Sequence, residues 1–246
     1  MKSILLAATA FLFSAVVMAQ TKADDVIKMN IEKYDFGKIK QNVPVVYNFE
    51  IKNTSDKPVV VENFCAIRAA FHTPISGVKH EIIITPKMSF GTGHHATTHM
   101  MIQAMEQIDL ANKTVFDFGT GTGVLAILAE QCGAKKITAI DNDEWSISNA
   151  EENISVNNCS KVNLYKATEI AENERYEVVL ANINRNILLE HMASIKQHIT
   201  VNGVVLMSGL LTGDEAIIAA SAQKENLAIK HRYQMNGWIC LLVVNT

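Results

Sequence analysis

The feature that most constrains the fold is a regular alternation of two kinds of segment from Glu81 onward. Short apolar runs, typical of buried strands, alternate with longer segments in which apolar residues recur every three or four positions. This alternation predicts strands and helices in turn, and therefore a parallel sheet covered by helices. The expected fold class is α/β.

Within this region the pattern predicts five helices and seven strands. The helices should lie near residues 97–107, 123–131, 144–157, 186–198 and 214–225, and the strands are TVFDF, KITAID, VNLYK, EVVLAN, GVVLMS, AIKHRYQ and WICLLVV. The last two strands follow each other with no helix between them, so they should form an antiparallel hairpin at one edge of a mostly parallel sheet. Ordinary dinucleotide-binding domains lack such a hairpin.

A glycine-rich turn, DFGTGTG at residues 117–123, joins the first of these strands to a helix. Such a turn brings backbone N–H groups close to a polar ligand at the carboxyl edge of a sheet. Its GxGxG spacing differs from the GxGxxG of nicotinamide and flavin sites, where the third glycine lets the helix pack near a pyrophosphate. The turn therefore favours a ligand without a pyrophosphate.

The next strand ends at Asp141, and an acidic residue at this position typically accepts hydrogen bonds from ribose hydroxyls. Together, DFGTGTG and AIDND resemble the S-adenosylmethionine site of class I methyltransferases, which have a Rossmann-like fold. Their ligand carries adenosine and a methionine chain without phosphates. The alternative is a structural glycine turn beside a solvated acidic pair.

A narrower resemblance lies in ITPKMSFGTGHHATTHMM, residues 84–101, read together with ANIN, residues 181–184. The pattern FGTG-x-H-x-TT, then D-x-G-x-G-x-G, then an acid, then A-N-I is similar to that of the ribosomal protein L11 methyltransferases. The resemblance covers about residues 61–246. It implies an enzyme, a cytoplasmic protein N-methyltransferase that uses S-adenosylmethionine. The implied partner is L11, whose lysine or α-amino groups the enzyme would methylate.

The same resemblance implies roles for individual residues. Thr98 would bind the methionine carboxylate, unless it only caps its helix. Gly119 would let the cofactor approach the backbone closely, and Asp141 would hold the ribose. Asn182 would orient the substrate amine through its side-chain oxygen, so it is the expected catalytic residue. The expected cofactor-binding residues are Thr98, Gly119, Thr120, Gly121, Gly123, Asp141 and Asn182.

Other polar residues carry less information. His95 matches the family's histidine, but loop histidines are more often solvated or structural than general bases, and a role in chemistry stays open. The four cysteines are scattered without a CxxC pair, so we expect reduced thiols and no metal site. A net charge of -3 and a pI near 6.2 argue against a broad basic face for direct nucleic-acid binding.

The first 61 residues point in another direction. Residues 1–19, with Lys2, an apolar run and small residues before a cleavage position, are typical of a secretory signal. Residues 20–61 include YDFGKI and YNFEIKNTSDKPVVV, which resemble the opening strands of exported immunoglobulin-like β-sandwich domains and predict a β-hairpin. We then expect a linker with one strand at 62–85 and the methyltransferase domain at 86–246.

Two alternatives stay open, and the first of them follows from the conflict between export and a cytoplasmic enzyme. The first is an exported or membrane-tethered fusion product, joined near residues 59–68, whose methyltransferase part lacks a substrate-capture domain. No stable membrane partner is expected for the catalytic domain itself. The second is a nicotinamide-dependent oxidoreductase, which the GxGxG spacing disfavours.

Overall fold

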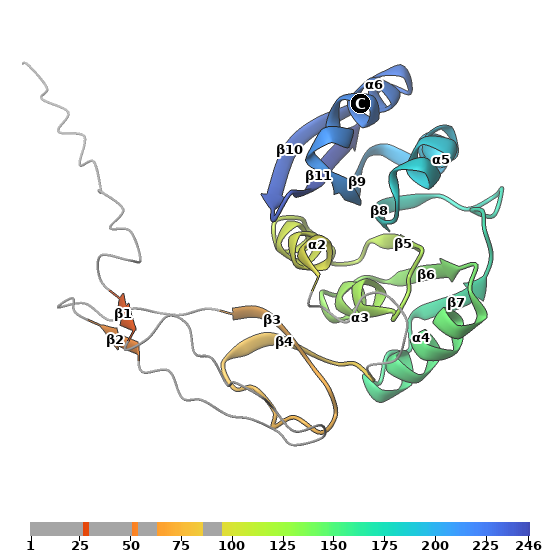
Figure 1. The fold of residues 1–246 in the computed structure, drawn as a ribbon. Coiled ribbons are helices and arrows are strands. Elements are labelled where there is room, and N and C mark those ends of the chain that lie inside the picture. Colours follow the sequence, from red (N-terminus) through yellow and green to blue (C-terminus); the bar gives the residue numbers. More distant parts are fainter. Residues whose placement is uncertain (1–26, 30–50, 54–62, 86–94) are drawn as a thin grey trace, which may run out of the picture. The chain divides into compact units, whose positions relative to one another are not determined.

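The computed structural model describes residues 27–29, 51–53, 63–85 and 95–246 (Figure 1). The chain divides into two units, Met1–Val61 and Glu62–Thr246. In the first unit, β1 (Ile27–Met29) pairs antiparallel with β2 (Ile51–Asn53). The expected signal segment and the turn NTSDKP of the expected hairpin lie almost entirely outside the described residues. None of the described helices is long and apolar enough to cross a membrane.

The second unit contains a seven-stranded sheet in the order β10-β11-β9-β8-β5-β6-β7. Its strands are β5 (Thr114–Phe118), β6 (Lys136–Asp141), β7 (Val162–Lys166), β8 (Tyr176–Asn182), β9 (Ile199–Leu211), β10 (Leu227–Met235) and β11 (Trp238–Asn245). The strands from β9 to β7 are parallel, whereas β11 is antiparallel to both β9 and β10. The predicted α/β fold and its antiparallel hairpin at one edge are confirmed.

Five α-helices in this unit begin and end within one or two residues of their predicted positions. They are α2 (Ala96–Glu106), α3 (Val124–Gln131), α4 (Glu144–Val156), α5 (Arg185–His198) and α6 (Glu215–Lys224). Side-chain caps set several of these starts: Asp143 accepts from the backbone N–H of Ser146 at 2.9 Å, and Asn184 accepts from those of Asn186 and Ile187. A short 3₁₀ turn, η1 (Thr212–Asp214), precedes α6.

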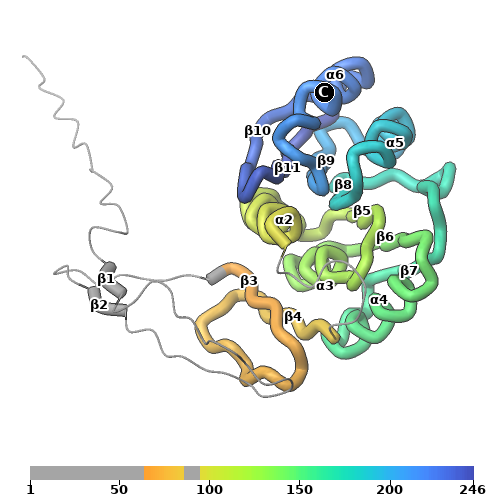
Figure 2. Tube along the Cα trace, viewed as in Figure 1, coloured from red at the N-terminus to blue at the C-terminus, as the bar shows by residue number. Residues whose placement is uncertain are grey.

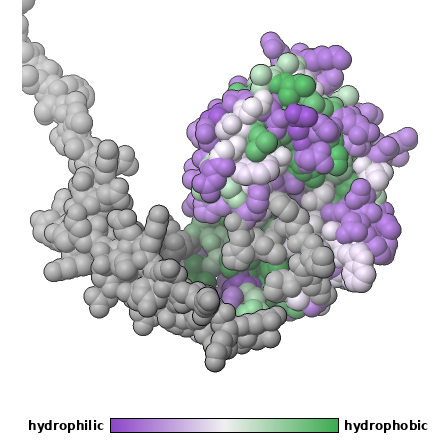
Figure 3. Space-filling view, in the orientation of Figure 1, coloured by the Kyte–Doolittle hydropathy of each residue, from purple (hydrophilic) through white to green (hydrophobic). Residues whose placement is uncertain are grey.

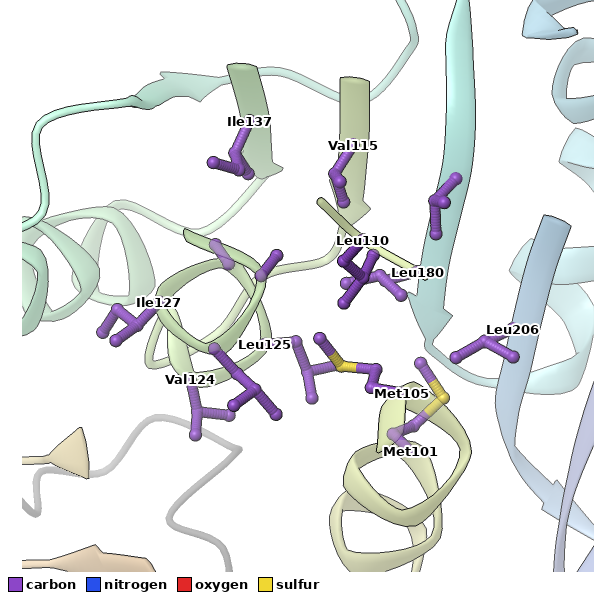
Figure 4. Packing of buried hydrophobic residues seen from close by; sticks show 14 of the residues in the cluster. Met101, Met105, Leu110, Val115, Val124, Leu125, Ile127, Ile137, Leu180 and Leu206 are labelled. Carbon is purple, nitrogen blue, oxygen red and sulfur yellow. The ribbon is translucent and has the colours of Figure 1, made fainter. Parts of the chain in front are cut away.

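Alternate strand residues enter two separate cores, as the two-residue period of a strand requires. On one face, Val115 and Leu180 pack with Met101 and Met105 of α2 and with side chains of α3 (Figure 4). On the other face, the neighbouring strand residues pack against α5 and α6. The sheet is thus covered by helices on both sides.

Segments far apart in the sequence meet on this framework. Helix α2, near the start of the unit, lies beside β10 and β11, as the views in Figures 1 and 2 both show. In the same orientation, hydrophilic residues cover most of the visible described surface, with hydrophobic residues in smaller groups between them (Figure 3).

Residues 63–83 differ from the prediction of a single strand. They form two strands, β3 (Asn63–Arg68) and β4 (Val78–Ile83), which pair in parallel as a small separate sheet. Parallel strands usually need a longer connection than residues 69–77 provide. Here Arg68 makes two hydrogen bonds to the carboxylate of Glu81, at 2.8 and 3.0 Å, and Glu81 also accepts from the backbone N–H of Ile75. This ion pair holds the short connection against both strands.

A cluster of charged groups lies at the amino end of the seven-stranded sheet, centred on Glu177. The carboxylate of Glu177, the second residue of β8, accepts from the backbone N–H of Thr114 and from Lys113 Nζ, both at 3.1 Å, and from Lys135 Nζ at 3.3 Å. The Thr114 hydrogen bond is the main reason why the pKa of Glu177 falls to about 2, and the two lysines lower it further.

Candidate functional site

A pocket of about 550 Å³ lies at the carboxyl ends of β5, β6, β8 and β9. Its volume is within the usual range of small-molecule sites. In open α/β sheets, ligands bind at this edge, outside the carboxyl ends of the strands. The position agrees with the one that the glycine turn and Asp141 predict.

The glycine turn after β5 is held against β6 by backbone hydrogen bonds. The N–H groups of Gly119 and Thr120 both donate to the carbonyl of Ile140, at 2.9 Å. Gly119, Gly121 and Gly123 have φ values of 71°, 56° and 81°, in the left-handed region that favours glycine. Gly119 and Gly121 line the pocket, whereas Gly123 caps α3 outside the lining.

Two acidic residues support this turn in different ways. Asp117 is fully buried beneath it, and burial raises its pKa to about 7 although Thr120 Oγ1 donates a 2.6 Å hydrogen bond to its carboxylate. Thr120 therefore faces Asp117 and does not line the pocket. Asp141 does line it, and its two carboxylate oxygens accept from the N–H groups of Gly121 and Asp143, at 2.9 and 3.0 Å.

The start of α2 forms one wall of the pocket. His95 is the N-cap of this helix: its Nδ1 accepts from the backbone N–H of Thr97 and lies 2.8 Å from Thr97 Oγ1. Its ring meets Trp238 edge-on, with centroids 4.8 Å apart. Because His95 is the cap, the reading of Thr98 as a plain helix cap is wrong. Both threonines are buried, and of the two only Thr97 is among the residues that line the pocket.

Asn182, the last residue of β8, lines this pocket and carries an unsatisfied polar atom. Its Nδ2 lies 3.5 Å from Thr98 Oγ1, while its Oδ1 is buried without a hydrogen-bond partner among the described residues. Buried polar atoms nearly always have partners. An oxygen left in this state at a pocket wall fits a ligand that donates a hydrogen bond.

Ile183, which follows Asn182 in the chain, is closely enclosed by two glycines. A Cβ atom on Gly119 would lie 2.4 Å from Ile183 Cγ2, and one on Gly209 would lie 2.3 Å from the Ile183 carbonyl oxygen. Both glycines have positive φ, so the tips of β5 and β9 close on Ile183 from two sides. The pocket needs glycine at both positions, and the glycine pattern of the turn predicted only the first.

Sequence reasoning missed the wall formed by α5 and β11. Ile187, Glu190 and His191 line the pocket from one side of α5, and Trp238 lines it from the first position of β11. The i, i+3, i+4 spacing of the α5 residues, counted from Ile187, could have indicated a shared face directly after the ANIN motif. Trp238 is brought in by the sheet order, which no local pattern contains.

The pocket fits a nucleoside with a cationic side chain better than a dinucleotide. Both oxygens of Asp141 keep a lone pair for ribose hydroxyls after accepting one N–H each. None of the described residues that line the pocket is a lysine or arginine, the side chains that usually bind a pyrophosphate. Thr98, Thr120 and Gly123 lie outside the lining, so direct ligand contact by these three stays a prediction.

Comparisons with known proteins agree with this geometry. The family model for ribosomal protein L11 methyltransferase (PrmA) matches residues 8–246. A ribosomal protein L11 methyltransferase of Porphyromonas gingivalis is 38% identical over 187 residues, 75% of this chain and 64% of that protein. One of Bacteroides fragilis is 36% identical over 200 residues, 80% of this chain and 71% of that protein. The chain thus spans about two thirds of the length of these relatives.

Among solved structures, ribosomal protein L11 methylase from Lactobacillus delbrueckii subsp. bulgaricus is similar with a TM-score of 0.69 and 28% identity, covering 74% of this chain and 95% of that one. A methyltransferase from Pyrococcus furiosus shares the fold, with a TM-score of 0.57 and 17% identity.

The family match starts at residue 8, so it includes residues 8–19 of the segment interpreted as a signal and all of the predicted sandwich fragment, and it gives no support to a fusion of unrelated parts. The nicotinamide alternative likewise finds no support, whereas the match to a methyltransferase family supports S-adenosylmethionine as the cofactor. By its family match, its relatives and its fold, the chain belongs to the family of ribosomal protein L11 methyltransferases.

Proposed function

We propose that the protein transfers methyl groups from S-adenosylmethionine to amino groups of ribosomal protein L11, in the cytoplasm. Family membership supports the choice of substrate. The observation that carries the reaction type is the buried, unpaired Oδ1 of Asn182 in a pocket whose opposite wall offers the Asp141 carboxylate. One wall has the acceptor that a ribose needs, and the other has an acceptor for an amine N–H.

Four residues would hold the cofactor. Asp141 accepts from the ribose hydroxyls, Gly119 and Gly121 allow close backbone approach, and Thr97 lies in the first turn of α2, whose N-terminus favours the carboxylate. When bound, S-adenosylmethionine supplies an electrophilic methyl group on a sulfonium. Pocket residues need supply no acid, because the leaving thioether is neutral.

The contribution of the chain to the chemical step is positioning. A lysine amine with a reference pKa of about 10.4 must lose a proton before it acts as a nucleophile. Asn182 Oδ1 accepts an N–H of the amine, so the lone pair turns toward the reacting carbon. Ile183, enclosed between Gly119 and Gly209, keeps the amide in this orientation. This role is orientation and not proton transfer.

Incubation of the full chain with S-adenosylmethionine and purified L11, followed by mass spectrometry of L11, tests the proposal. We expect mass gains in steps of one methyl group, confined to amino groups, and none in the presence of excess S-adenosylhomocysteine. Calorimetry in parallel should show binding of S-adenosylhomocysteine and no binding of NAD. An L11 that stays unmodified by a cofactor-binding enzyme would refute the assigned substrate.

A further inference from the structure

We propose that Glu190 on α5 binds the positively charged amino group of the substrate at the mouth of the pocket. This inference rests on the proposed function, because it assigns the acceptor side of the same site. Glu190 lines the pocket and is exposed, and no hydrogen bond or ion pair engages it within the part of the chain that the structure describes.

The order of strands separates a cofactor side from an acceptor side. Asp141 ends β6 and Asn182 ends β8, with β5 between these strands, so roughly 10 Å of sheet edge lies between the two residues. A ribose held at Asp141 leaves the reacting end of the cofactor toward β8 and β9. Residues that come directly after β8 therefore border the place where the amine must arrive.

Helix α5 follows β8 directly and turns two different faces to its surroundings. Leu188, Met192 and Ile195 are buried in the core against the sheet. Glu190 and His191 lie on the pocket side. His191 is half-buried, with its ring edge-on to Phe118 at 5.0 Å between centroids, whereas Glu190 is exposed. Glu190 thus lies nearer the solvent, where an approaching side chain meets the pocket first.

The charges around the pocket favour a cation at this place. Asp141 and Glu190 are the two carboxylates among its described lining residues, and no lysine or arginine is among them. Asp141 already accepts two backbone N–H groups. Arg185, at the start of α5, is engaged with Asp214 at 2.8 Å, so it does not neutralise Glu190. Glu190 is then the carboxylate available to an incoming ammonium group.

An ammonium group at Glu190 would be held one step before the reaction. The carboxylate attracts the amine in its prevalent charged form, and the amine reaches Asn182 after it has lost a proton to water. Glu190 should therefore act on substrate capture and leave the methyl transfer itself largely unchanged. That separation predicts an effect on KM rather than on kcat.

Kinetics of Glu190→Gln with L11 test this role. We expect KM for L11 to rise about fivefold, as for an exposed ion pair, with kcat within twofold of the wild type. The difference should shrink as salt screens the charges. Glu190→Asp should recover most of the loss. Glu106→Gln, an exposed carboxylate at the far end of α2, is the matched control and should change neither constant.

A binding measurement tests the same role without any methyl transfer. The full chain, saturated with S-adenosylhomocysteine, is titrated with n-butylammonium and with the neutral n-butanol, and the Trp238 indole N–H signal is followed by nuclear magnetic resonance. The wild type should prefer the cation, and Glu190→Gln should bind both equally. The dissociation constant of S-adenosylhomocysteine, measured by calorimetry, should stay the same in both proteins.

The outcomes separate this inference from the proposed function. A wild type that prefers the cation but leaves L11 unmodified supports Glu190 and refutes the substrate. A wild type that methylates L11 while Glu190→Gln keeps both the cation preference and the KM refutes Glu190. Weaker binding of S-adenosylhomocysteine to Glu190→Gln, at unchanged KM for L11, would also overturn the proposal, because Glu190 would then serve the cofactor.

Discussion

The two ends of β8 differ in how their polar groups are satisfied. At the amino end, Glu177 is hydrogen-bonded to a backbone N–H and paired with two lysines. Five residues later, at the carboxyl end, Asn182 carries a buried oxygen that no described group of the chain satisfies. One strand thus has a completed charge cluster at one end and an unsatisfied acceptor at the other.

The difference teaches where stability and binding are located in this sheet. A satisfied cluster lowers the free energy of the fold and has nothing left for a ligand, whereas an unpaired buried acceptor costs stability until a ligand donates to it. The positive-φ glycines Gly119 and Gly209 lie at the carboxyl end too. Substitutions of the polar groups at the two ends should therefore change different measurable quantities, whereas a glycine substitution at the carboxyl end should lower stability through steric strain. The four changes that follow test this.

The largest effect is expected from Gly209→Ala at the carboxyl end. The new Cβ would lie 2.3 Å from the backbone oxygen of Ile183, at a φ of +81°. Left-handed strain and overpacking together should lower the free energy of unfolding by roughly 3 kcal/mol or more. Gly77 has a φ of +80° but nothing within 4 Å of an added Cβ, so Gly77→Ala should cost only about 1 to 2 kcal/mol. Urea titration of both variants measures the two losses. Equal losses would show that strain alone matters.

Asn182→Ala should separate activity from stability. We expect kcat for L11 methylation to fall about 100-fold, because the amine loses its orienting acceptor, while cofactor affinity changes far less. Stability should hardly change, since the removed oxygen has no partner within the described chain. By contrast, Asn153→Ala should lower the free energy of unfolding by roughly 2 kcal/mol. The buried amide of Asn153 accepts from the backbone N–H of Thr85 and donates to the carbonyl of Thr122. Collapsed cofactor affinity at normal kcat would make Asn182 a cofactor ligand only.

Asp141→Ala should weaken S-adenosylhomocysteine binding by about 1 to 3 kcal/mol, since two ribose hydroxyls lose a charged acceptor. Isothermal calorimetry measures this directly. Asp109 is an exposed carboxylate away from the pocket that, like Asp141, accepts from a backbone N–H, here that of Ala111. Asp109→Ala should leave the affinity unchanged. An unaltered dissociation constant for the Asp141 variant would move the ribose contact to another residue.

The smallest effect is expected at the amino end, from Glu177→Gln, and it depends on pH. The pKa of Glu177 lies near 2, below its ordinary value of 4.5, so the ionised carboxylate stabilises the fold above pH 4.5. This contribution is lost as the pH falls from 4.5 toward 2. At pH 7 the substitution should cost about 1 kcal/mol, discounted for solvent exposure, and cofactor affinity should not change. A stability loss that persists undiminished at pH 2 would contradict the assigned cause.

Local patterns were sufficient for the elements of the second unit and for part of its site. Helix α5 and strand β6 follow from periodicity and length, and Asp141 and Asn182 lie in the pocket because strand tips of a parallel sheet meet at one edge. Pairing between distant segments has no such local signal. The parallel partner of β3, the contact of Gly209 with Ile183 and the place of Trp238 all depend on it.

The Thr97 and Thr98 positions show a finer limit of the same kind. Both threonines belong to the FGTG-x-H-x-TT pattern, but only Thr97 lines the pocket. Which of the two does so depends on where α2 starts. That start is set by the His95 side chain, whose capping bond to Thr97 competes with other possible caps. Helix boundaries within one residue were beyond what composition and spacing specify.

The order of the strands also bears on how the protein is made. Strand β11 follows β10 in sequence yet lies between β10 and β9. During synthesis, β9 therefore keeps an open edge until residues 238–245 have left the ribosome, and Trp238 joins the pocket only then. A nascent chain that stops before β11 would have the glycine turn and Asp141 but an incomplete pocket. The complete pocket therefore forms only after β11 has paired with β9.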